Sequence, residues 1–183
     1  MTMGATSKGL LCAAIIGCLF LASVASVAGL DDDVDAGWRM AELIETDNTG
    51  HAYNSQVAVD GSGNGVAVWQ QWDGTHDNIW SNRYVVGAGW GTATLVELDA
   101  SGPAQCPQVA VDDSGNAIAV WHQWDGTLNS IYSNRYVVGT GWGTPTLIET
   151  GDSGHAQFPQ VAIHGSGDAM VVWNQHDGTR DNI

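Results

Sequence analysis

The sequence predicts an all-β protein built from tandem four-stranded antiparallel sheets of 52 residues, arranged like the blades of a β-propeller. The pentapeptide Gln-Val-Ala-Val-Asp at Gln56 returns 52 residues later at Gln108, and again as Gln-Val-Ala-Ile-His at Gln160. A constant period of this size is typical of solenoids, propellers and other arrays of small units. The 24 glycines and 9 tryptophans, without long helical patterns, favour short strands joined by tight turns.

One repeat contains four expected strands. In the central copy they are residues 108–111, 117–123, 131–138 and 146–149. An Asp-Asp-Ser-Gly-Asn turn at Asp112 separates the first two strands, and an Asp-Gly-Thr turn at Asp125 separates the next two. The Gly-Trp-Gly segment around Trp142 breaks the chain before the fourth strand.

Apolar residues occupy both faces of the first two strands, and alanine recurs on one face. A strand of a β-sandwich would have one solvent-exposed, polar face, whereas a strand of a sheet that is covered on both sides would not. The pattern therefore favours propeller blades, whose crowded inner strands need small side chains. Trp69, Trp121 and Trp173 are expected to be wedges between blades.

The repeats are assigned to residues 37–88, 89–140 and 141–183, the last of them truncated. A lone fourth strand, from Trp38 to Glu45, is expected before the first complete set. The sequence thus contains about three blades, whereas a propeller needs four or more to close. We expect an incomplete propeller that belongs to a longer reading frame.

The first 28 residues are interpreted as a signal peptide, followed by an acidic linker at residues 29–36. Lys8 precedes an uncharged apolar run that ends in small residues around Ala28, as in secretory leaders. This predicts a secreted, periplasmic or cell-surface protein without membrane insertion after leader cleavage. Two alternatives stay open: the run remains as a membrane anchor, or Cys18 is the lipidated cysteine of a lipoprotein.

The formal net charge is −15, and all 20 acidic residues lie after position 30. This charge excludes nucleic acids and anionic membranes as main partners, since both need a basic face. Cys106 is the only cysteine expected in the mature chain, because Cys12 and Cys18 leave with the leader. No internal disulfide is possible then, and Cys106 is interpreted as an incidental small residue.

The recurring words Val-Asp-x-Ser-Gly-Asn-Ala-x-Ala-Val-Trp, Asn-Arg-Tyr and Gly-x-Gly-Trp-Gly support a resemblance. From Gly37 to the end, the chain resembles exported bacterial β-propeller repeat proteins of the sialidase-like (BNR) type. The Gly-Trp-Gly element has the position of the Asp-box of those propellers, but the Ser-x-Asp-x-Gly-x-Thr-Trp order is missing. A weaker similarity is to fucose-binding lectin propellers, whose units pair an arginine strand with a Gly-Trp turn.

Arg83 and Arg135 invite comparison with the arginine cluster with which sialidases hold a carboxylate. Because they occupy one repeat position, we favour a structural role, in which they pair with acidic residues of the repeat. The expected partners are Asp73 and Asp125, or Glu97 and Glu149. A Tyr/Glu nucleophile pair, a Ser-His-Asp triad and zinc-ligand spacing are not found in the sequence.

Oxygen donors cluster in the turns at residues 73–78 and 177–182 and at Asp112-Asp113. Calcium binding at these turns is possible, but the spaced donors of an EF-hand are missing and turn chemistry explains the residues. No cofactor is therefore predicted.

Positions that differ between repeats are the candidates for ligand binding. A binding site either contains residues that differ between the repeats or recurs in every groove between blades. Aromatic rings beside amides and carboxylates are the groups that bind sugars. The candidate ligand-binding residues are Trp72, Trp124, His176, Trp80, Tyr132 and His122. The alternative is that these rings only cover blade edges.

Three functions stay open from the sequence. The first is a non-catalytic surface protein that binds a glycan or a partner protein. The second is an N-terminal fragment of a sialidase-like glycoside hydrolase. The third is a structural spacer within a large surface protein.

Overall fold

The computed structural model describes residues 40–98, 102–151 and 153–183. The expected signal peptide, the acidic linker and Trp38 lie outside these residues. Two compact units are distinguished along the chain, Met1–Ile44 and Glu45–Ile183, and the second holds every strand described below. None of the described residues belongs to a helix that is long and apolar enough to cross a membrane.

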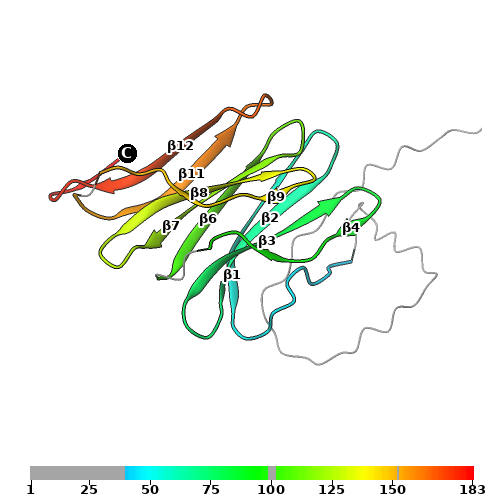
Figure 1. The fold of residues 1–183 in the computed structure, drawn as a ribbon, viewed down its shortest axis with the longest axis horizontal. Helices are drawn as coiled ribbons and strands as arrows, with labels where there is room; N and C mark the ends of the chain where they lie inside the picture. Colours follow the sequence, from blue (N-terminus) through cyan, green and yellow to red (C-terminus); the bar gives the residue numbers. More distant parts are fainter. Residues whose placement is uncertain (1–39, 99–101, 152) are drawn as a thin grey trace, which may run out of the picture. The chain divides into compact units, whose positions relative to one another are not determined.

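The first repeat folds into a five-stranded antiparallel sheet (Figure 1). Strands β1, β2 and β3 are neighbours in that order, and both β4 and β5 pair with β3. The two short strands lie one after the other along β3, so together they take the place of the fourth strand. The bounds are β1 Ala52–Val59, β2 Gly65–Trp72, β3 Asp77–Val85, β4 Gly89–Trp90 and β5 Thr94–Leu95.

The second repeat gives a sheet of the same design, and the third gives a three-stranded sheet, β11-β12-β13. The second sheet contains β6 Ala104–Val111, β7 Ala117–Trp124, β8 Asn129–Val137, β9 Gly141–Trp142 and β10 Thr146–Leu147. The third contains β11 Ala156–Ile163, β12 Ala169–His176 and β13 Asp181–Asn182. The all-β class and the repeating antiparallel units are therefore as the sequence predicts.

Three details differ from the sequence-based expectation. The lone strand from Trp38 to Glu45 is wrong over its described residues 40–45, which form no strand and pair with none of the described strands. The Gly-Trp segments, expected as breaks, pair with β3 and β8 as β4 and β9. The first strand of the second sheet starts at Ala104, not at Gln108, because a β-bulge carries the pairing past Pro107.

The Asp112 turn is held by its own side chains. The Asp112 carboxylate accepts hydrogen bonds from the backbone N–H groups of Ser114 and Asn116 and from the Asn116 amide. In turn, Asn116 Oδ1 accepts the Val138 N–H at 3.1 Å. The Asp-x-Ser-Gly-Asn words therefore recur because each one closes a hairpin and fixes it to the end of the third strand.

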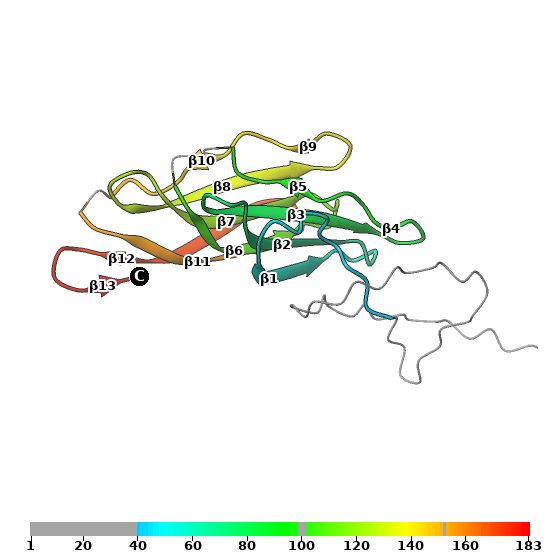
Figure 2. The ribbon, with the colours of Figure 1, turned by 90° about the horizontal axis from the view of Figure 1, so that it is seen from below.

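Each sheet has two faces, which we name by their second strand. The tryptophan face carries Trp69, Trp121 or Trp173, and the valine face carries the alternate positions, Val66 and Val68 in β2. Val66 and Val68 pack with Ala117, Ala119 and Trp121 in one buried cluster, so the valine face of one sheet covers the tryptophan face of the next. Figures 1 and 2 show the three sheets side by side in sequence order.

Trp121 is fully buried between the first and second sheets, as expected of a wedge. Its indole N–H donates to Gln123 Oε1 at 2.9 Å. Equivalent bonds join Trp69 to Gln71 and Trp173 to Gln175. The glutamine two places after each tryptophan therefore recurs because a buried indole N–H needs an acceptor.

Candidate functional site

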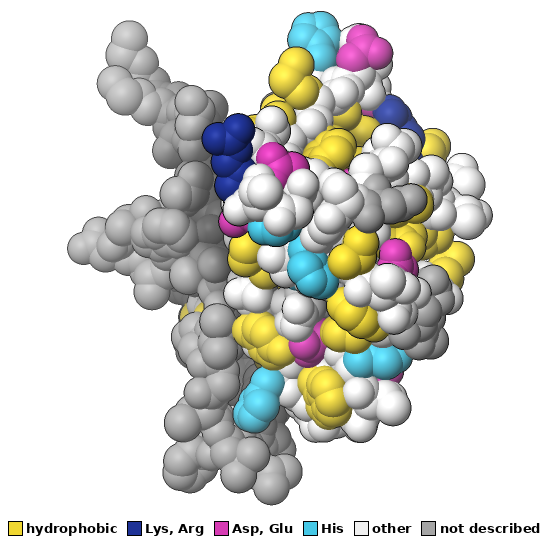
Figure 3. Space-filling view, turned by 90° about the vertical axis from the view of Figure 1, so that its left-hand side faces the viewer, with side chains coloured by type: hydrophobic (Ala, Val, Ile, Leu, Met, Phe, Trp, Pro, Cys, Tyr) yellow, Lys and Arg dark blue, Asp and Glu magenta, His cyan; other side chains and the backbone are white. Residues whose placement is uncertain are grey.

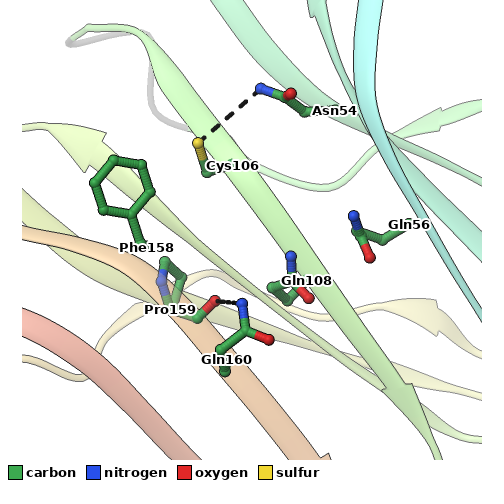
Figure 4. Close-up of a pocket in the computed structure, with 7 residues that line it drawn as sticks. All are labelled: Asn54, Gln56, Cys106, Gln108, Phe158, Pro159 and Gln160. Carbon is green, nitrogen blue, oxygen red and sulfur yellow. Dashed lines mark hydrogen bonds between the residues drawn. The ribbon is translucent and has the colours of Figure 1, made fainter. Parts of the chain in front are cut away.

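The first strands of the three sheets, β1, β6 and β11, run side by side and enclose a hollow of about 180 Å³ (Figure 4). We call it the axial hollow. All of its lining side chains come from these three strands, and none of them is charged. They are Asn54, Gln56, Cys106, Gln108, Phe158, Pro159 and Gln160.

A β-bulge in each first strand builds the hollow. The pairing register shifts once in each of the three strands, just after Tyr53, Gln105 and Gln157. The next residue has a positive φ in every case, 54° at Asn54, 53° at Cys106 and 54° at Phe158. This left-handed conformation costs a residue with a Cβ about 1–2 kcal/mol. Bulges of this kind re-aim side chains, and here they aim at the hollow.

The bulge residues break the uniformity of the repeat. Asn54, Cys106 and Phe158 are repeat-equivalent yet chemically different, whereas a glutamine follows each of them two places on. Figure 4 shows the three bulge residues together with the glutamines of the three strands. Phe158 is 55% exposed, so its ring is available to a ligand. The hollow therefore combines one apolar ring with a set of amides.

Gln70, a buried residue of β2, holds two of the bulges in place. Its Oε1 accepts a hydrogen bond from Asn54 Nδ2 at 3.0 Å and one from the Cys106 backbone N–H at 3.2 Å. One side chain thereby fixes the lining of β1 and the neighbouring β6. A buried amide with both of these donors satisfied supports a preorganised site.

His122 takes the place of Gln70 in the second sheet. Its ring lies edge-on to Phe158, with 5.7 Å between the ring centroids, and only 3% of the residue is exposed. Nδ1 is buried without a hydrogen-bond partner. Burial favours the neutral imidazole and lowers the pKa of His122 to about 4. This sequence-predicted residue therefore supports the hollow from behind Phe158.

The buried carboxylate of Asp77 lies at the start of β3. The Tyr53 hydroxyl donates to Asp77 Oδ1 at 2.7 Å, and Gln105 Nε2 donates to Asp77 Oδ2 at 3.0 Å. Burial, and then the hydrogen bond to Asp77, raise the pKa of Tyr53. Because Tyr53 holds its proton and both oxygens of Asp77 are engaged, this cluster ties two sheets together and does not offer a nucleophile.

Cys106, interpreted from sequence as incidental, lines the hollow at a bulge. Burial raises the pKa of its thiol, and its sulfur lies 4.0 Å from Asn54 Nδ2. A thiol without an adjacent base or cation stays protonated at neutral pH and is a weak nucleophile. Cys106 therefore contributes shape to the lining and not covalent chemistry.

Trp72, Trp124 and His176 end β2, β7 and β12 at equivalent positions, away from the lining of the hollow. Each one covers a glycine that precedes the first strand, where a Cβ would lie within 2.3–2.7 Å of the covering residue. Those glycines are Gly50, Gly102 and Gly154. Trp124 also stacks on His155, with 6.1 Å between the centroids. These rings seal strand ends, although 41% of Trp72 stays exposed.

Trp80 and Tyr132 are half-buried on the third strands, directly opposite the wedge residues Trp69 and Trp121. Tyr132 stacks on Trp121, with centroids 6.3 Å apart and an angle of 17° between the planes. The six predicted residues are thus divided among three places, and His122 alone adjoins the axial hollow. The bulge residues Asn54, Cys106 and Phe158 vary between repeats but are not among the sequence-based candidates. Each lies two residues before the glutamine at which the first strand was expected to begin, whereas the strand begins earlier in the structure.

A second hollow of about 190 Å³ lies between the first and second sheets, beside Arg83. Arg83 Nη1 donates to the Gly115 carbonyl at 2.7 Å, and its guanidinium lies 5.3 Å from the centre of the Tyr136 ring. The Trp142 indole N–H donates to Ser81 Oγ at 2.6 Å. The strongest polar groups here already bind across the two sheets, so this hollow is a clamp between them.

Arg135 binds neighbouring turns, as a structural role requires, but its expected partners, Asp125 and Glu149, are wrong. Arg135 lies 3.6 Å from Asp112, in the turn of its own sheet, and donates to the Gly167 carbonyl of the next sheet at 3.2 Å. Asp125 instead accepts hydrogen bonds from the backbone of its own turn. The physical reason is the position of Arg135. It lies near the end of β8, beside the turn that joins β6 to β7 and holds Asp112.

The Asp-rich turns use their carboxylates internally. Hydrogen bonds from the Thr75 and His76 backbone lower the pKa of Asp73, and bonds from the Thr179 and Asn182 side chains lower that of Asp177. Within residues 40–98, 102–151 and 153–183, no three His, Cys, Asp or Glu residues gather in a way that could hold a metal ion. These carboxylates are therefore engaged in the hydrogen bonds of their own turns.

No family model and no curated protein matches the chain. Among solved structures, the chain is similar to the endo-arabinase from Bacteroides thetaiotaomicron VPI-5482, with a TM-score of 0.50 and 16% sequence identity. The likeness covers 78% of this chain and 57% of the other, so the chain spans less than two thirds of that enzyme. At this identity the likeness concerns the fold alone. The chain has an all-β, propeller-like fold of antiparallel blades.

Proposed function

We propose that this chain is a non-catalytic, exported carbohydrate-binding protein whose axial hollow takes a neutral sugar. The observation that carries the proposal is the uncharged lining, in which the exposed Phe158 ring lies among amides from three different strands. The resemblance to glycan-active propellers and the similarity to a structure named as an endo-arabinase support the same ligand class.

The chemistry of the lining suits a sugar. Glutamine and asparagine amides donate and accept at once, as neighbouring hydroxyl groups require. An aromatic ring offers the apolar surface on which the C–H groups of a sugar ring can pack. The volume of about 180 Å³ is below the range of drug-sized pockets, about 300–1,000 Å³. The hollow therefore fits a single sugar unit of a chain.

The charges favour a neutral sugar over an acidic one. Among the described residues, no lysine, arginine or histidine lines the hollow, and the net charge of −15 repels anions. Arg83 and Arg135 are both engaged with turn carbonyls. On the face drawn in Figure 3, acidic and histidine side chains lie among uncharged ones, and basic side chains are scarce. A sialic acid would have no cation to pair with its carboxylate.

The second candidate is a fragment of a sialidase-like glycoside hydrolase, which the name of the similar structure favours. Most glycoside hydrolases place a carboxyl group on either side of the scissile bond, and sialidases use a tyrosine as the nucleophile. Neither a carboxyl group nor a tyrosine is among the described residues that line the axial hollow, and the nearby Asp77 and Tyr53 are bound to each other. We therefore rank binding above hydrolysis for this chain.

The test is calorimetric titration of the full chain with neutral oligosaccharides of pentoses and hexoses, and with sialylated ones in parallel. We expect binding of a neutral sugar only. Phe158→Ala should weaken it at least about tenfold, which corresponds to about 1.4 kcal/mol. Since Phe158 is more than half exposed, its replacement should leave the fold intact, which circular dichroism would verify.

Trp72→Ala is the matched control, because it removes another exposed ring outside the hollow. Loss of binding in Trp72→Ala with retention in Phe158→Ala would move the site to the strand ends. Absence of binding to every sugar by a folded protein would leave the structural spacer as the better description. Release of reducing ends from the oligosaccharides would favour the hydrolase.

A further inference from the structure

A backbone N–H group starts a chain of hydrogen bonds behind the axial hollow. The bulge in β6 leaves the Cys106 N–H out of the strand pairing, because the extra residue of a bulge stays unpaired in the ladder. Gln70 Oε1 accepts this N–H at 3.2 Å, and Gln70 is only 1% exposed. A backbone N–H can only donate, so the end of the Gln70 amide that meets it must be the oxygen. The orientation of the Gln70 amide is therefore fixed by its backbone partner.

The same oxygen fixes the amide of Asn54, which lines the hollow. Asn54 Nδ2 lies 3.0 Å from Gln70 Oε1 and 4.0 Å from Cys106 Sγ. Because the Gln70 atom is an acceptor, only the NH2 end of the Asn54 amide can face it. Within the described residues, the side-chain hydrogen bonds of Asn54 all run through Nδ2. The Asn54 oxygen is thereby the end of this amide that is left for a ligand.

Gln160, which lines the hollow from β11, orients its amide in the same sense. Its Nε2 donates to the Pro159 carbonyl at 3.0 Å, and a carbonyl oxygen can only accept. Figure 4 shows the Gln160 oxygen directed away from Pro159. Two lining amides, one on β1 and one on β11, thus use their donors within the protein and keep their oxygens.

The pairing of Asn54 with Gln70 belongs to the first repeat alone. Cys106 and Phe158 occupy the position of Asn54 in the other two repeats, and neither has an amide to orient. His122 occupies the position of Gln70 in the second repeat. The same bulge forms in all three first strands, so the fold does not need this pair of amides. The pair is therefore a property of the hollow and not of the repeating unit.

We propose that Gln70 is a positioning residue that makes the axial hollow selective for a sugar hydroxyl group acting as a donor. By holding the NH2 group of Asn54, Gln70 presents the Asn54 oxygen to the ligand, and a hydroxyl group of the sugar donates to that oxygen. This inference rests on the proposed binding of a neutral sugar and adds the polarity of one contact. A site with a fixed acceptor rejects an analogue that has lost the matching donor, because the acceptor then stays unpaired.

The test is an NMR titration of the full chain with the methyl glycosides of glucose, galactose, xylose and arabinose. Each glycoside is also used as the set of analogues in which one hydroxyl group is replaced by fluorine, which is of similar size but cannot donate. For a parent glycoside that binds, we expect one analogue to bind the wild type at least about tenfold more weakly. In Gln70→Met the Asn54 amide is free to turn, so this ratio of affinities should fall to about twofold or less.

Gln71→Met is the matched control on the same strand. Gln71 is also 1% exposed, and its Oε1 accepts the Trp69 indole N–H at 2.8 Å. This change likewise leaves a buried donor without its acceptor, but outside the lining of the hollow. Gln71→Met should therefore lose stability in urea unfolding, as Gln70→Met does, and still keep the wild-type ratio of affinities.

Asn54→Ala is a second variant, which tests the acceptor itself. Cys106 and Phe158 adopt nearly the same positive φ without an asparagine side chain, so the fold should survive this change. The ratio should fall here as in Gln70→Met. A wild-type ratio in either variant would overturn the inference while leaving sugar binding in place. Absence of binding by every parent glycoside would overturn the proposed function, and the inference with it.

Discussion

Replacing His122 with glutamine should remove a large part of the acid sensitivity of the fold. His122 is 3% exposed, and burial lowers its pKa to about 4, against 6.5 for the unfolded chain. The folded state therefore resists protonation that the unfolded state accepts. The contribution of His122 to the free energy of unfolding is fully present above pH 6.5 and is lost as the pH drops from there towards 4.

The magnitude follows from the two pKa values. Each unit of difference is worth about 1.36 kcal/mol, so the full effect is about 3 kcal/mol once the pH has reached 4. By the same relation, the free energy of unfolding loses about 0.2 kcal/mol at pH 7 and about 2 kcal/mol at pH 5. Glutamine does not titrate, and it is the residue at the equivalent position of the first sheet, Gln70.

The assay is urea unfolding, followed by circular dichroism, of the wild type and His122→Gln at pH 7 and pH 5. The difference in unfolding free energy between the two proteins should move by about 2 kcal/mol in favour of the variant at pH 5. His122→Asn, with the residue that the third sheet carries at position 174, should show the same pH shift despite different packing. Parallel pH curves for all three proteins would show that His122 is not buried as a neutral imidazole.

Three further predictions concern packing, turns and the thiol. Trp121→Ala should lower the unfolding free energy by about 3–5 kcal/mol, because it empties a fully buried site; Trp173→Ala, on a half-buried ring, should cost clearly less, and equal losses in urea titrations would argue against the wedge. Asp112→Ala should cost about 2 kcal/mol at pH 7, because three donors lose their acceptor. Burial by itself would raise the pKa of Asp112, but hydrogen bonds from Asn116 and Ser114 outweigh it and lower that pKa, so this loss should shrink as the pH falls below 3.8; a loss independent of pH in unfolding curves would contradict this. Iodoacetamide should modify Cys106 more slowly in the folded chain than in urea at pH 8, as peptide mass spectrometry would show, because burial raises its thiol pKa; equal rates would place the thiol in solvent.

The sequence was sufficient for the repeating unit because its signals are local. Turn words such as the one at Asp112 carry their own hydrogen-bonding partners, and the tryptophan of each second strand has its acceptor two places away. Short continuous apolar runs then indicate which strands are covered on both faces. With the period of 52 residues, the Asp-x-Ser-Gly-Asn turn occurs twice and the tryptophan–glutamine pair occurs three times.

The ligand-binding candidates were harder to choose, because exposure and neighbours across sheets are not local properties. Trp72 and Trp124 were selected as variable aromatic positions, yet they cover glycines at strand ends. Phe158 lies before the expected strand start at Gln160, and only the structure shows that β11 already begins at Ala156. The expected partners of Arg135 were Asp125 and Glu149, acidic residues that recur in the repeat. Its partner in the structure is Asp112, in a turn that lies beside it in space.

The sequence alone determined the class of fold, the order of strands within a sheet and the residues that close each turn, since these depend on contacts within one repeat. Only the tertiary structure decided where function can reside. The axial hollow exists because three bulges, 52 residues apart in the chain, meet on adjacent strands. The positive φ that aims Asn54, Cys106 and Phe158 has no composition signal, because none of the three is glycine. The three bulges meet at one hollow only because the first strands of neighbouring sheets contact each other, which no single repeat contains.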